Sequence, residues 1–116
     1  MRAAVCEAYG GPEVVHVVDL PSPPLVAGHV RVRVQAASVN FPDVLVVANR
    51  YQISVPAPFT VGSEFAGLVE EVGDGVSGLT LGDRVSGTGL VGAFAEEVVV
   101  PATALTPIPD GVEAGV

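Results

Sequence analysis

Five polar side chains in this sequence have the chemistry for hydrogen bonding or proton transfer, and each stands at the end of an apolar segment. They are Asn40, Asp43, Tyr51, Ser63 and Glu64, which supply an amide, a phenol, a hydroxyl and two carboxylates. In strand-rich folds, binding residues gather on the loops at the ends of strands. Ordinary structural roles are equally open to them: Asn40 suits a helix cap and Asp43 a helix dipole. Tyr51 suits a buried ring, and the other two suit turns.

Metal and nucleophilic chemistry are poorly supported. The histidines, His16 and His29, lie in separate predicted strands, and neither has a second ligand at a useful spacing. The single cysteine, Cys6, forms no internal disulfide, and its alternating surroundings predict a buried core residue. No Gly-x-Ser-x-Gly or similar setting is present for a catalytic triad. We therefore expect neither a metal site nor a covalent nucleophile.

One segment matches the spacing of a dinucleotide-binding fingerprint. Gly87 to Gly92 spells Gly-x-Gly-x-x-Gly, a motif that needs a preceding strand and a following helix. The residues that follow, Ala93 to Val100, are typical of a strand. We therefore interpret the match as accidental.

The composition favours one globular domain rich in β-structure. Of the 116 residues, 49% are hydrophobic and only 16% charged, and valine, which favours strands, is abundant. The formal net charge is −8, which argues against nucleic acid and anionic membrane surfaces as partners. The sequence has neither an apolar run long enough to cross a membrane nor a secretory leader. We expect a cytoplasmic protein.

Hydrophobic periodicity predicts short strands separated by turns. The clearest is His29–Gln35, continuing toward Asn40, in which valines alternate with polar residues. Further strands are predicted at 2–8, 13–20, 65–72, after Asp83, 93–100 and 104–108. A short helix is predicted over Phe41–Asn49, where Pro42 suits the first turn, and Tyr51–Thr60 is predicted to be an irregular loop. Seven or eight strands with one helix indicate a closed or nearly closed barrel.

Several motifs occur in order along the chain. They are Asn40-Phe-Pro-Asp43 with Tyr51, Gly62-Ser-Glu-Phe-Ala-Gly67, Gly82-Asp-Arg-Val85 and Gly92-Ala-Phe-Ala-Glu96. Together they resemble the medium-chain dehydrogenase/reductase superfamily, and within it the zinc-free NADPH:quinone oxidoreductase (zeta-crystallin-like) branch. The resemblance covers essentially the whole chain. It implies a mainly β fold, namely a GroES-like, partly open β-barrel with one or two short helices.

The same resemblance implies a protein of two domains, one that binds the substrate and one that binds the nucleotide. Residues 1–116 would form the N-terminal substrate-side domain, and a Rossmann nucleotide-binding domain is expected after residue 116. That second domain would bind most of the NADPH, so this chain alone is expected to be inactive. The full-length protein is expected to be a homodimer that acts on a small-molecule quinone or enone-type acceptor.

The resemblance also assigns roles to individual residues. Zinc-dependent members carry a cysteine at the position of Asn40 and a histidine at that of Ser63, and neither side chain here would hold zinc. By carry-over Asn40 and Tyr51 are catalytic, with Asn40 on the nicotinamide side of the cleft and Tyr51 as a proton donor. Four further residues are predicted to line the substrate pocket or to contact the residues that line it, namely Phe41, Asp43, Ser63 and Glu64.

The sequence differs from many quinone reductases at two positions, and two other functions remain open. Leu45 and Val47 stand where many quinone reductases carry a tyrosine and an arginine, which predicts a less polar pocket. An enoyl-thioester or activated-alkene reductase of the same superfamily is the first alternative. The second is a non-enzymatic GroES-like binding module, although the prolines of Tyr51–Thr60 fit a cleft wall better than a mobile docking loop.

Overall fold

The computed structural model describes residues 1–89 and 91–109, with the backbone alone at Phe41. Its strands are β1 (Arg2–Cys6), β2 (Val15–Asp19), β3 (His29–Ser38), β4 (Phe59–Thr60), β5 (Glu64–Val72), β6 (Arg84–Thr88), β7 (Glu97–Pro101) and β8 (Leu105–Pro107). One α-helix, α1 (Phe41–Val47), and two 3-10 turns, η1 (Pro12–Val14) and η2 (Ala102–Ala104), complete the described elements. No helix in these ranges is long and apolar enough to cross a membrane. The predicted mainly β fold with one or two short helices is confirmed.

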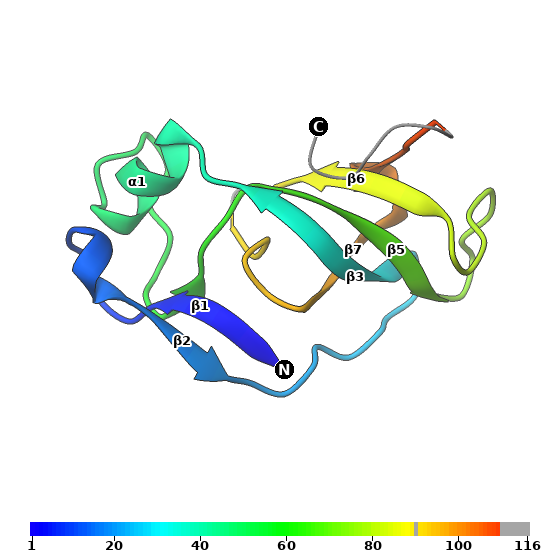
Figure 1. Cartoon of the computed structure of the whole chain (residues 1–116), viewed down its shortest axis with the longest axis horizontal. Coiled ribbons are helices and arrows are strands. Elements are labelled where there is room, and N and C mark those ends of the chain that lie inside the picture. The colour runs from blue at the N-terminus through cyan, green and yellow to red at the C-terminus, as the bar shows by residue number, and fades with distance from the viewer. Residues whose placement is uncertain (90, 110–116) are drawn as a thin grey trace.

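The strands form two antiparallel sheets, which we call sheet A and sheet B. Sheet A has the order β2-β1-β4, and sheet B has the order β7-β3-β5-β6-β8. Figure 1 shows the β1–β2 hairpin facing the larger sheet, with α1 at one end of the space between them. Within the described residues the two sheets are linked by one isolated bridge, Ala3 to Ala95. The barrel is therefore partly open, as predicted, and the alternative of full closure is not realised.

A three-residue connector, Phe94–Glu96, ties the two sheets together. The Ala4 N–H donates to the Phe94 carbonyl oxygen at 2.8 Å, and the Glu96 N–H donates to the Arg2 carbonyl oxygen at 3.1 Å. On the other side, the Val34 N–H of β3 donates to the Glu96 carbonyl oxygen at 2.9 Å. The connector thus satisfies backbone groups of β1 and β3 at once, which fixes the spacing between the sheets.

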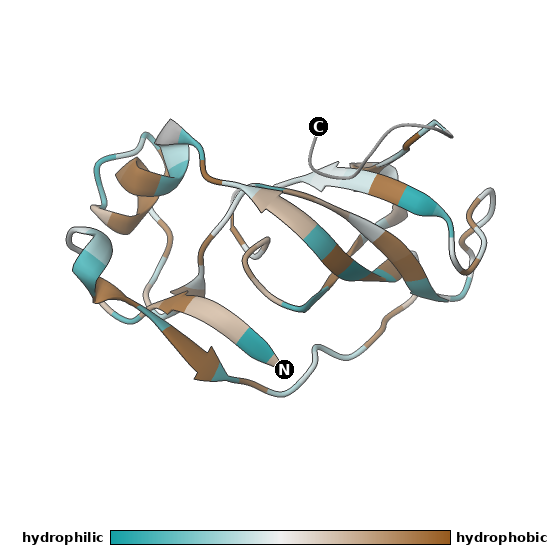
Figure 2. Ribbon diagram, in the orientation of Figure 1, coloured by the Kyte–Doolittle hydropathy of each residue, from teal (hydrophilic) through white to brown (hydrophobic). Residues whose placement is uncertain are grey.

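The alternating sequence of β3 suits an interior strand of sheet B, where it lies between β7 and β5. Val30 and Val32 are fully buried, whereas Arg31 and Arg33 extend to the opposite face. Figure 2 shows the same alternation of hydrophobic and hydrophilic residues along β3. This is the period-2 pattern expected of a strand with one face on the core, so the strongest sequence prediction is confirmed.

The hydrophobic core consists of two clusters. The sheet B cluster is built on Val30, Val32, Phe65, Val69, Val85, Ala93 and Val98. The α1 cluster is built on Cys6, Val46, Val47, Phe59 and Val61. Phe94 packs against both clusters, so one aromatic ring joins them. Cys6 is completely buried, which confirms its predicted place in the core.

Several strands are shorter or begin elsewhere than predicted: β1 ends at Cys6 rather than Ala8, and β2 begins at Val15, after η1, rather than at Glu13. Three further differences have a clear local cause. The helix ends at Val47 rather than Asn49, because Asn49 adopts φ 56, a left-handed conformation that stops helices. The supposed loop Tyr51–Thr60 contains the short strand β4, which pairs with β1. Strand β7 begins at Glu97 rather than Ala93, since the Ala93 and Phe94 N–H groups bond instead to the Gly62 and Val61 carbonyls.

Candidate functional site

The start of α1 brings two of the predicted site residues together. Asn40 is the N-cap, and its backbone N–H donates to Asp43 Oδ2 at 2.8 Å. The Asp43 N–H in turn donates to the Asn40 backbone oxygen at 3.0 Å. Pro42 in the first turn has no N–H to satisfy, as helix starts require. The predicted capping role of Asn40 is therefore confirmed, and Asp43 is locked in one orientation.

This arrangement leaves two buried polar atoms without a partner. Only 4% of the Asp43 surface is exposed, yet its Oδ1 has no hydrogen-bond partner in the described part of the chain. The same is true of Asn40 Nδ2, a buried donor. An unsatisfied buried polar group costs about 1–3 kcal/mol, so native proteins rarely leave one unless it has a use. These two atoms mark the start of α1 as a place built for an additional partner.

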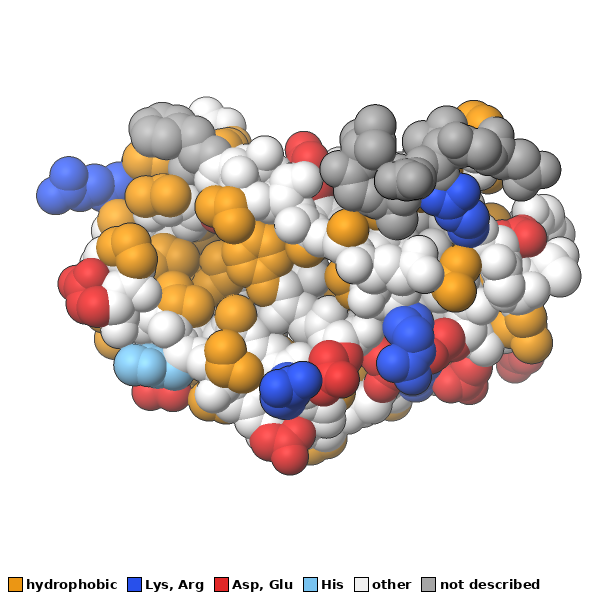
Figure 3. All heavy atoms as spheres, in the orientation of Figure 1, with side chains coloured by type: hydrophobic (Ala, Val, Ile, Leu, Met, Phe, Trp, Pro, Cys, Tyr) orange, Lys and Arg blue, Asp and Glu red, His pale blue; other side chains and the backbone are white. Residues whose placement is uncertain are grey.

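An apolar pocket opens directly beside this pair. Its volume is about 350 Å³, and Asp43 is the one charged residue among the ten that line it. Val44 and Val47 of α1 form one wall, the Gly10–Pro12 turn forms the second, and Val61 with Phe94 closes the third. Figure 3 shows hydrophobic side chains gathered in this hollow between α1 and the β1–β2 hairpin. Apolar walls with one polar group are typical of small-molecule sites.

Glycines allow the pocket walls to approach one another. The Gly10 N–H donates to the Val47 carbonyl oxygen at 3.0 Å, which fastens the turn before η1 to the end of α1. Gly62 has φ +110, and an added Cβ there would overlap the Phe94 ring. The absence of a side chain at Gly62 therefore allows Phe94 to lie flat against the backbone and form the pocket wall.

The other predicted site residues do not enter this pocket. Tyr51 is half-buried and packs against the α1 cluster. Ser63 lines a separate, smaller cavity of about 190 Å³. Glu64 is exposed at the start of β5, in register with Ser38 on one side and Thr88 on the other. The side chain of Phe41 lies outside the described part of the structure.

Sequence reasoning did not single out Phe94 and Val61 as pocket residues. Val61 precedes Gly62, Phe94 lies two residues after Gly92, and the sequence pattern assigns them only to a turn and a strand. The usable signal is Gly62, because a glycine before an apolar segment indicates a close approach of another group to the backbone. Identifying Phe94 as that group required the structure.

The described residues offer little for metal binding or nucleophilic catalysis. Within residues 1–89 and 91–109, no group of three or more His, Cys, Asp or Glu side chains is placed to hold a metal ion. Burial raises the pKa of the Cys6 thiol, although the bond from Cys6 Sγ to the Ala8 carbonyl oxygen, at 3.1 Å, opposes this. Cys6 therefore stays a protonated core thiol rather than a nucleophile.

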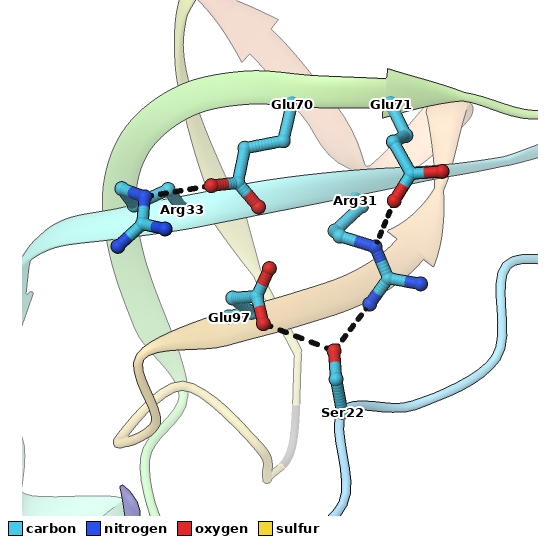
Figure 4. Close-up of polar contacts among 6 residues, drawn as sticks. All are labelled: Ser22, Arg31, Arg33, Glu70, Glu71 and Glu97. Atoms are coloured by element: carbon cyan, nitrogen blue, oxygen red, sulfur yellow. Dashed lines mark hydrogen bonds and ion pairs between the residues drawn. The ribbon is translucent and has the colours of Figure 1, made fainter. Parts of the chain in front are cut away.

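The densest charge network lies on the outer face of sheet B, and none of its residues lines the pocket beside α1. A register shift between Arg31 and Val32 leaves Glu70 as an extra residue on β5, next to Glu71. Arg31 Nε donates to Glu71 at 2.7 Å, and Arg33 Nε donates to Glu70 at 2.6 Å. Figure 4 shows Glu97 of β7 facing the same group, bonded to Ser22 at 3.0 Å.

Two of these carboxyls, Glu70 and Glu97, shift each other's pKa in opposite directions. The hydrogen bond with Glu97 raises the pKa of Glu70, burial adds to this, and Arg33 opposes it. The same hydrogen bond lowers the pKa of Glu97, with further help from Ser22, Arg31 and Arg33. A carboxyl whose pKa rises on folding stabilises the fold at low pH and loses that contribution as pH increases through the folded pKa. The raised pKa of Glu70 therefore adds stability at low pH, and this contribution is lost as the carboxyl ionises.

Replacing Glu70 with Gln is expected to raise the free energy of unfolding at pH 7 by about 0.5 kcal/mol. The neutral amide removes the repulsion with Glu97 and still offers an N–H donor, whereas the exposed ion pair with Arg33 contributes little. Urea unfolding at several pH values should show this advantage shrinking as pH falls and Glu70 itself becomes protonated. Glu71→Gln, which removes the ion pair with Arg31, is the control and should not raise the free energy of unfolding. A loss of stability in Glu70→Gln at every pH would contradict the repulsion between Glu70 and Glu97.

Comparison with known proteins places these features in a family. Residues 26–110 match the model of the alcohol dehydrogenase GroES-like domain. A quinone oxidoreductase-like protein 2 homolog of Nematostella vectensis is 42% identical over 109 residues, which are 93% of this chain and 30% of that protein. A mycocerosic acid synthase-like polyketide synthase of Mycobacterium tuberculosis is 44% identical over 84 residues, which are 72% of this chain and 4% of that protein.

A solved structure shares the fold as well as the sequence. The quinone oxidoreductase from Thermus thermophilus, determined alone and in complex with NADPH, superposes with a TM-score of 0.83 at 36% identity. The match covers 98% of this chain and 34% of that one. The chain thus spans about a third of the length of the quinone oxidoreductase and the quinone oxidoreductase-like protein that it matches, and a far smaller part of the polyketide synthase.

Proposed function

Because this chain belongs to the alcohol dehydrogenase GroES-like domain family, we propose that it is the substrate-side domain of a longer NADPH-dependent oxidoreductase. The proposed reaction transfers hydride to a quinone or similar activated acceptor without zinc. A Rossmann nucleotide-binding domain would supply most of the NADPH site, and the full-length protein would be a homodimer. The similarity to a quinone oxidoreductase that binds NADPH supports this assignment.

The observation that carries the proposal is the pocket beside α1. It is apolar, it has a volume suited to a small molecule, and Asp43, which is bonded to Asn40 at the start of α1, is among the residues that line it. None of its ten lining residues is a cysteine or histidine. Such a site favours an apolar acceptor that is already electrophilic enough to accept hydride, because it offers no Lewis acid to activate one.

In the proposed reaction NADPH supplies the hydride, which is the chemistry that this chain lacks. Asn40 Nδ2 fits the nicotinamide side of the cleft, because it is a buried donor still in need of an acceptor. The Asp43 carboxylate holds the Asn40 backbone in place through the 2.8 Å bond. The resemblance assigns the proton for the reduced acceptor to Tyr51, which packs against the α1 cluster and is not among the residues that line the pocket. Reduction of a quinone then consumes one hydride and one proton and yields the hydroquinone.

Zinc does not fit the donor set. The positions at which zinc-dependent members carry cysteine and histidine are occupied by Asn40 and Ser63, an amide and a hydroxyl. Zinc sites in proteins use thiolate, imidazole or carboxylate ligands. Ser63 also lines a different cavity from the pocket that contains Asp43. These observations support a zinc-free reaction.

Tyr51→Phe is expected to lower kcat of the full-length enzyme about tenfold or more with enone substrates and much less with quinones. Reduction of a carbon–carbon double bond needs a proton delivered to carbon, whereas the oxygen of a reduced quinone can also take its proton from water when Tyr51 is absent. NADPH oxidation followed at matched acceptor concentrations would measure both rates. Equal losses with both acceptors would mean that Tyr51 only shapes the site. Tyr9→Phe is the control, since the Tyr9 hydroxyl bonds to the Val55 carbonyl at 2.7 Å and serves the loop.

NADPH oxidation by the full-length gene product, in EDTA, is the direct test. A panel of quinones and a panel of enoyl thioesters would be offered separately. Quinone turnover that is indifferent to EDTA would support the proposal, and turnover abolished by EDTA would refute the zinc-free reaction. The absence of NADPH oxidation with either panel would favour the binding module and overturn the proposed function.

An enoyl-thioester or activated-alkene reductase is the second candidate. The observation that favours it is the 44% identity with part of a polyketide synthase. The half-buried position of Tyr51 beside the α1 cluster is compatible with a phenol used as an acid. Turnover of thioesters alone in the panel experiment would select this candidate over the quinone reductase.

A further inference from the structure

We infer that the pocket beside α1 binds a hydrocarbon substituent of the acceptor, and that the reducible group of the acceptor lies outside the pocket, near Asn40. The inference rests on the proposed function and deepens it, because it names the class of acceptor that the reductase takes. That class is a quinone or similar activated acceptor that carries an uncharged hydrocarbon chain.

The side chains of the pocket offer a ligand almost no hydrogen bonds. Nine of the ten lining residues are glycines, a proline, valines and a phenylalanine. The tenth, Asp43, is only 4% exposed, and its Oδ2 accepts the Asn40 backbone N–H at 2.8 Å. The other oxygen, Oδ1, has almost no accessible surface. A charged or strongly polar group inside the pocket would therefore lose its hydration without gaining a partner.

Backbone groups of all three walls are also bonded within the protein. The Gly10 N–H donates to the Val47 carbonyl oxygen at 3.0 Å, and the Phe94 N–H donates to the Val61 carbonyl oxygen at 2.8 Å. The Phe94 carbonyl oxygen in turn accepts the Ala4 N–H at 2.8 Å. A quinone ring placed among these walls would bury its carbonyl oxygens without donors, which is unfavourable. A hydrocarbon chain needs no such partner and gains free energy by leaving water.

The polar side chains assigned to the reaction lie outside the pocket. Tyr51 packs against the α1 cluster, and neither Tyr51 nor Asn40 is among the ten lining residues. Asn40 nevertheless directly follows Val39, an exposed residue that does line the pocket. An acceptor whose ring lies beside Asn40 can therefore extend a chain past Val39 into the pocket.

The volume of the pocket limits the length of the chain. It is about 350 Å³, whereas an apolar cavity of about 150 Å³ is enough to hold a benzene ring. In proportion, the pocket takes a chain on the order of ten carbons. Carbons beyond that number would remain in solvent and add little to the affinity.

A series of straight-chain primary alcohols from butanol to dodecanol tests the inference, because the hydroxyl stays in water while the chain enters the pocket. Titration of the isotope-labelled full-length protein without NADPH, followed by NMR at the methyl groups of Val15, Val47 and Val61, gives each dissociation constant. Affinity is expected to rise about fourfold per added carbon and to level off at about ten carbons. Octanol should bind at least about tenfold more tightly than the diol with a hydroxyl at each end of the same chain, since the second hydroxyl would be buried without a partner. No binding, an increase that continues to dodecanol, or equal affinity for octanol and the diol would overturn the inference.

Two half-exposed valines offer a matched pair of variants. Val44 lines the pocket and is 47% exposed, whereas Val26 is 50% exposed and is not among the lining residues. Val44→Asn should weaken the binding of decanol about fivefold, because it replaces apolar contact with an amide. Val26→Asn is the control and should leave the dissociation constant unchanged. An unchanged affinity in Val44→Asn, or an equal loss in both variants, would refute the assignment to this pocket.

Turnover separates the inference from the proposed function. With a series of alkyl-substituted benzoquinones, KM of the full-length enzyme is expected to fall as the chain lengthens while kcat stays constant. The reason is that the chain is bound equally well before and during hydride transfer. Quinone reduction with a KM indifferent to chain length would overturn the inference and leave the reductase intact. The expected alcohol series in a protein that never oxidises NADPH would leave the binding of hydrocarbon chains intact and overturn the reductase.

Discussion

Gly67→Ala should lower the free energy of unfolding by about 3–5 kcal/mol, enough to unfold a domain of ordinary stability. Gly67 lies in the middle of β5, between Val34 of β3 and Val85 of β6. A Cβ added there would overlap the Arg33 carbonyl oxygen, a backbone atom of the neighbouring interior strand β3. Neither strand has room to move, because each is hydrogen-bonded on both sides. The overlap must therefore break part of the β3–β5 ladder.

The register of sheet B explains why this position requires glycine. Val34 pairs with Gly67 and Ala36 pairs with Ala66, so Gln35 has no partner on β5. Such a bulge presses one strand against the other locally. Urea unfolding followed by circular dichroism would measure the loss. Gly89→Ala is the control, since the nearest atom to its added Cβ is the Val91 carbonyl oxygen at an ordinary 3.7 Å. Equal stability of the two variants would contradict this account.

Gly62→Ala is expected to cost about 2–4 kcal/mol, through two effects that can be separated. The first is the strain of φ +110, and the second is overlap with the Phe94 ring. Gly75→Ala isolates the first, because Gly75 has φ +82 and open space around it. That control should cost about 1 kcal/mol. The difference between the two variants measures the contact with Phe94.

A double variant tests the contact itself. Removal of the ring in Phe94→Ala destabilises the core, but it also makes room for a side chain at residue 62. The cost of Gly62→Ala should therefore be at least about 1 kcal/mol smaller in the Phe94→Ala background. Strictly additive costs would mean that the ring moves aside and that the pocket wall is not held by Gly62.

The sequence was most informative where one local rule dominates. Alternating valines determined β3 and the buried face of sheet B, and Asn40 followed by Pro42 and Asp43 predicted the helix start. The fold class followed from many short strands and from the motif order. Each of these features depends on neighbours within a few residues, which a pattern can capture.

The candidate site was only half predictable, because it depends on long-range placement. Asn40 and Asp43 lie on one turn of helix and were correctly grouped. Tyr51 and Ser63 were grouped with them by sequence order, but they contact the α1 cluster and a second cavity respectively. Strand β4 was missed because two residues have no periodicity, and its existence depends on pairing with β1.

The connector Phe94–Glu96 has a consequence for how the molecule opens. Sheet A is small, and a hairpin with a two-residue third strand has little stability alone. Sheet A is nevertheless hydrogen-bonded to the connector, which is in turn hydrogen-bonded to β3. The Phe94 ring also packs against both the sheet B cluster and the α1 cluster. Release of sheet A therefore exposes the interior of sheet B as well. The two sheets should lose protection against hydrogen exchange together, as one cooperative unit rather than two.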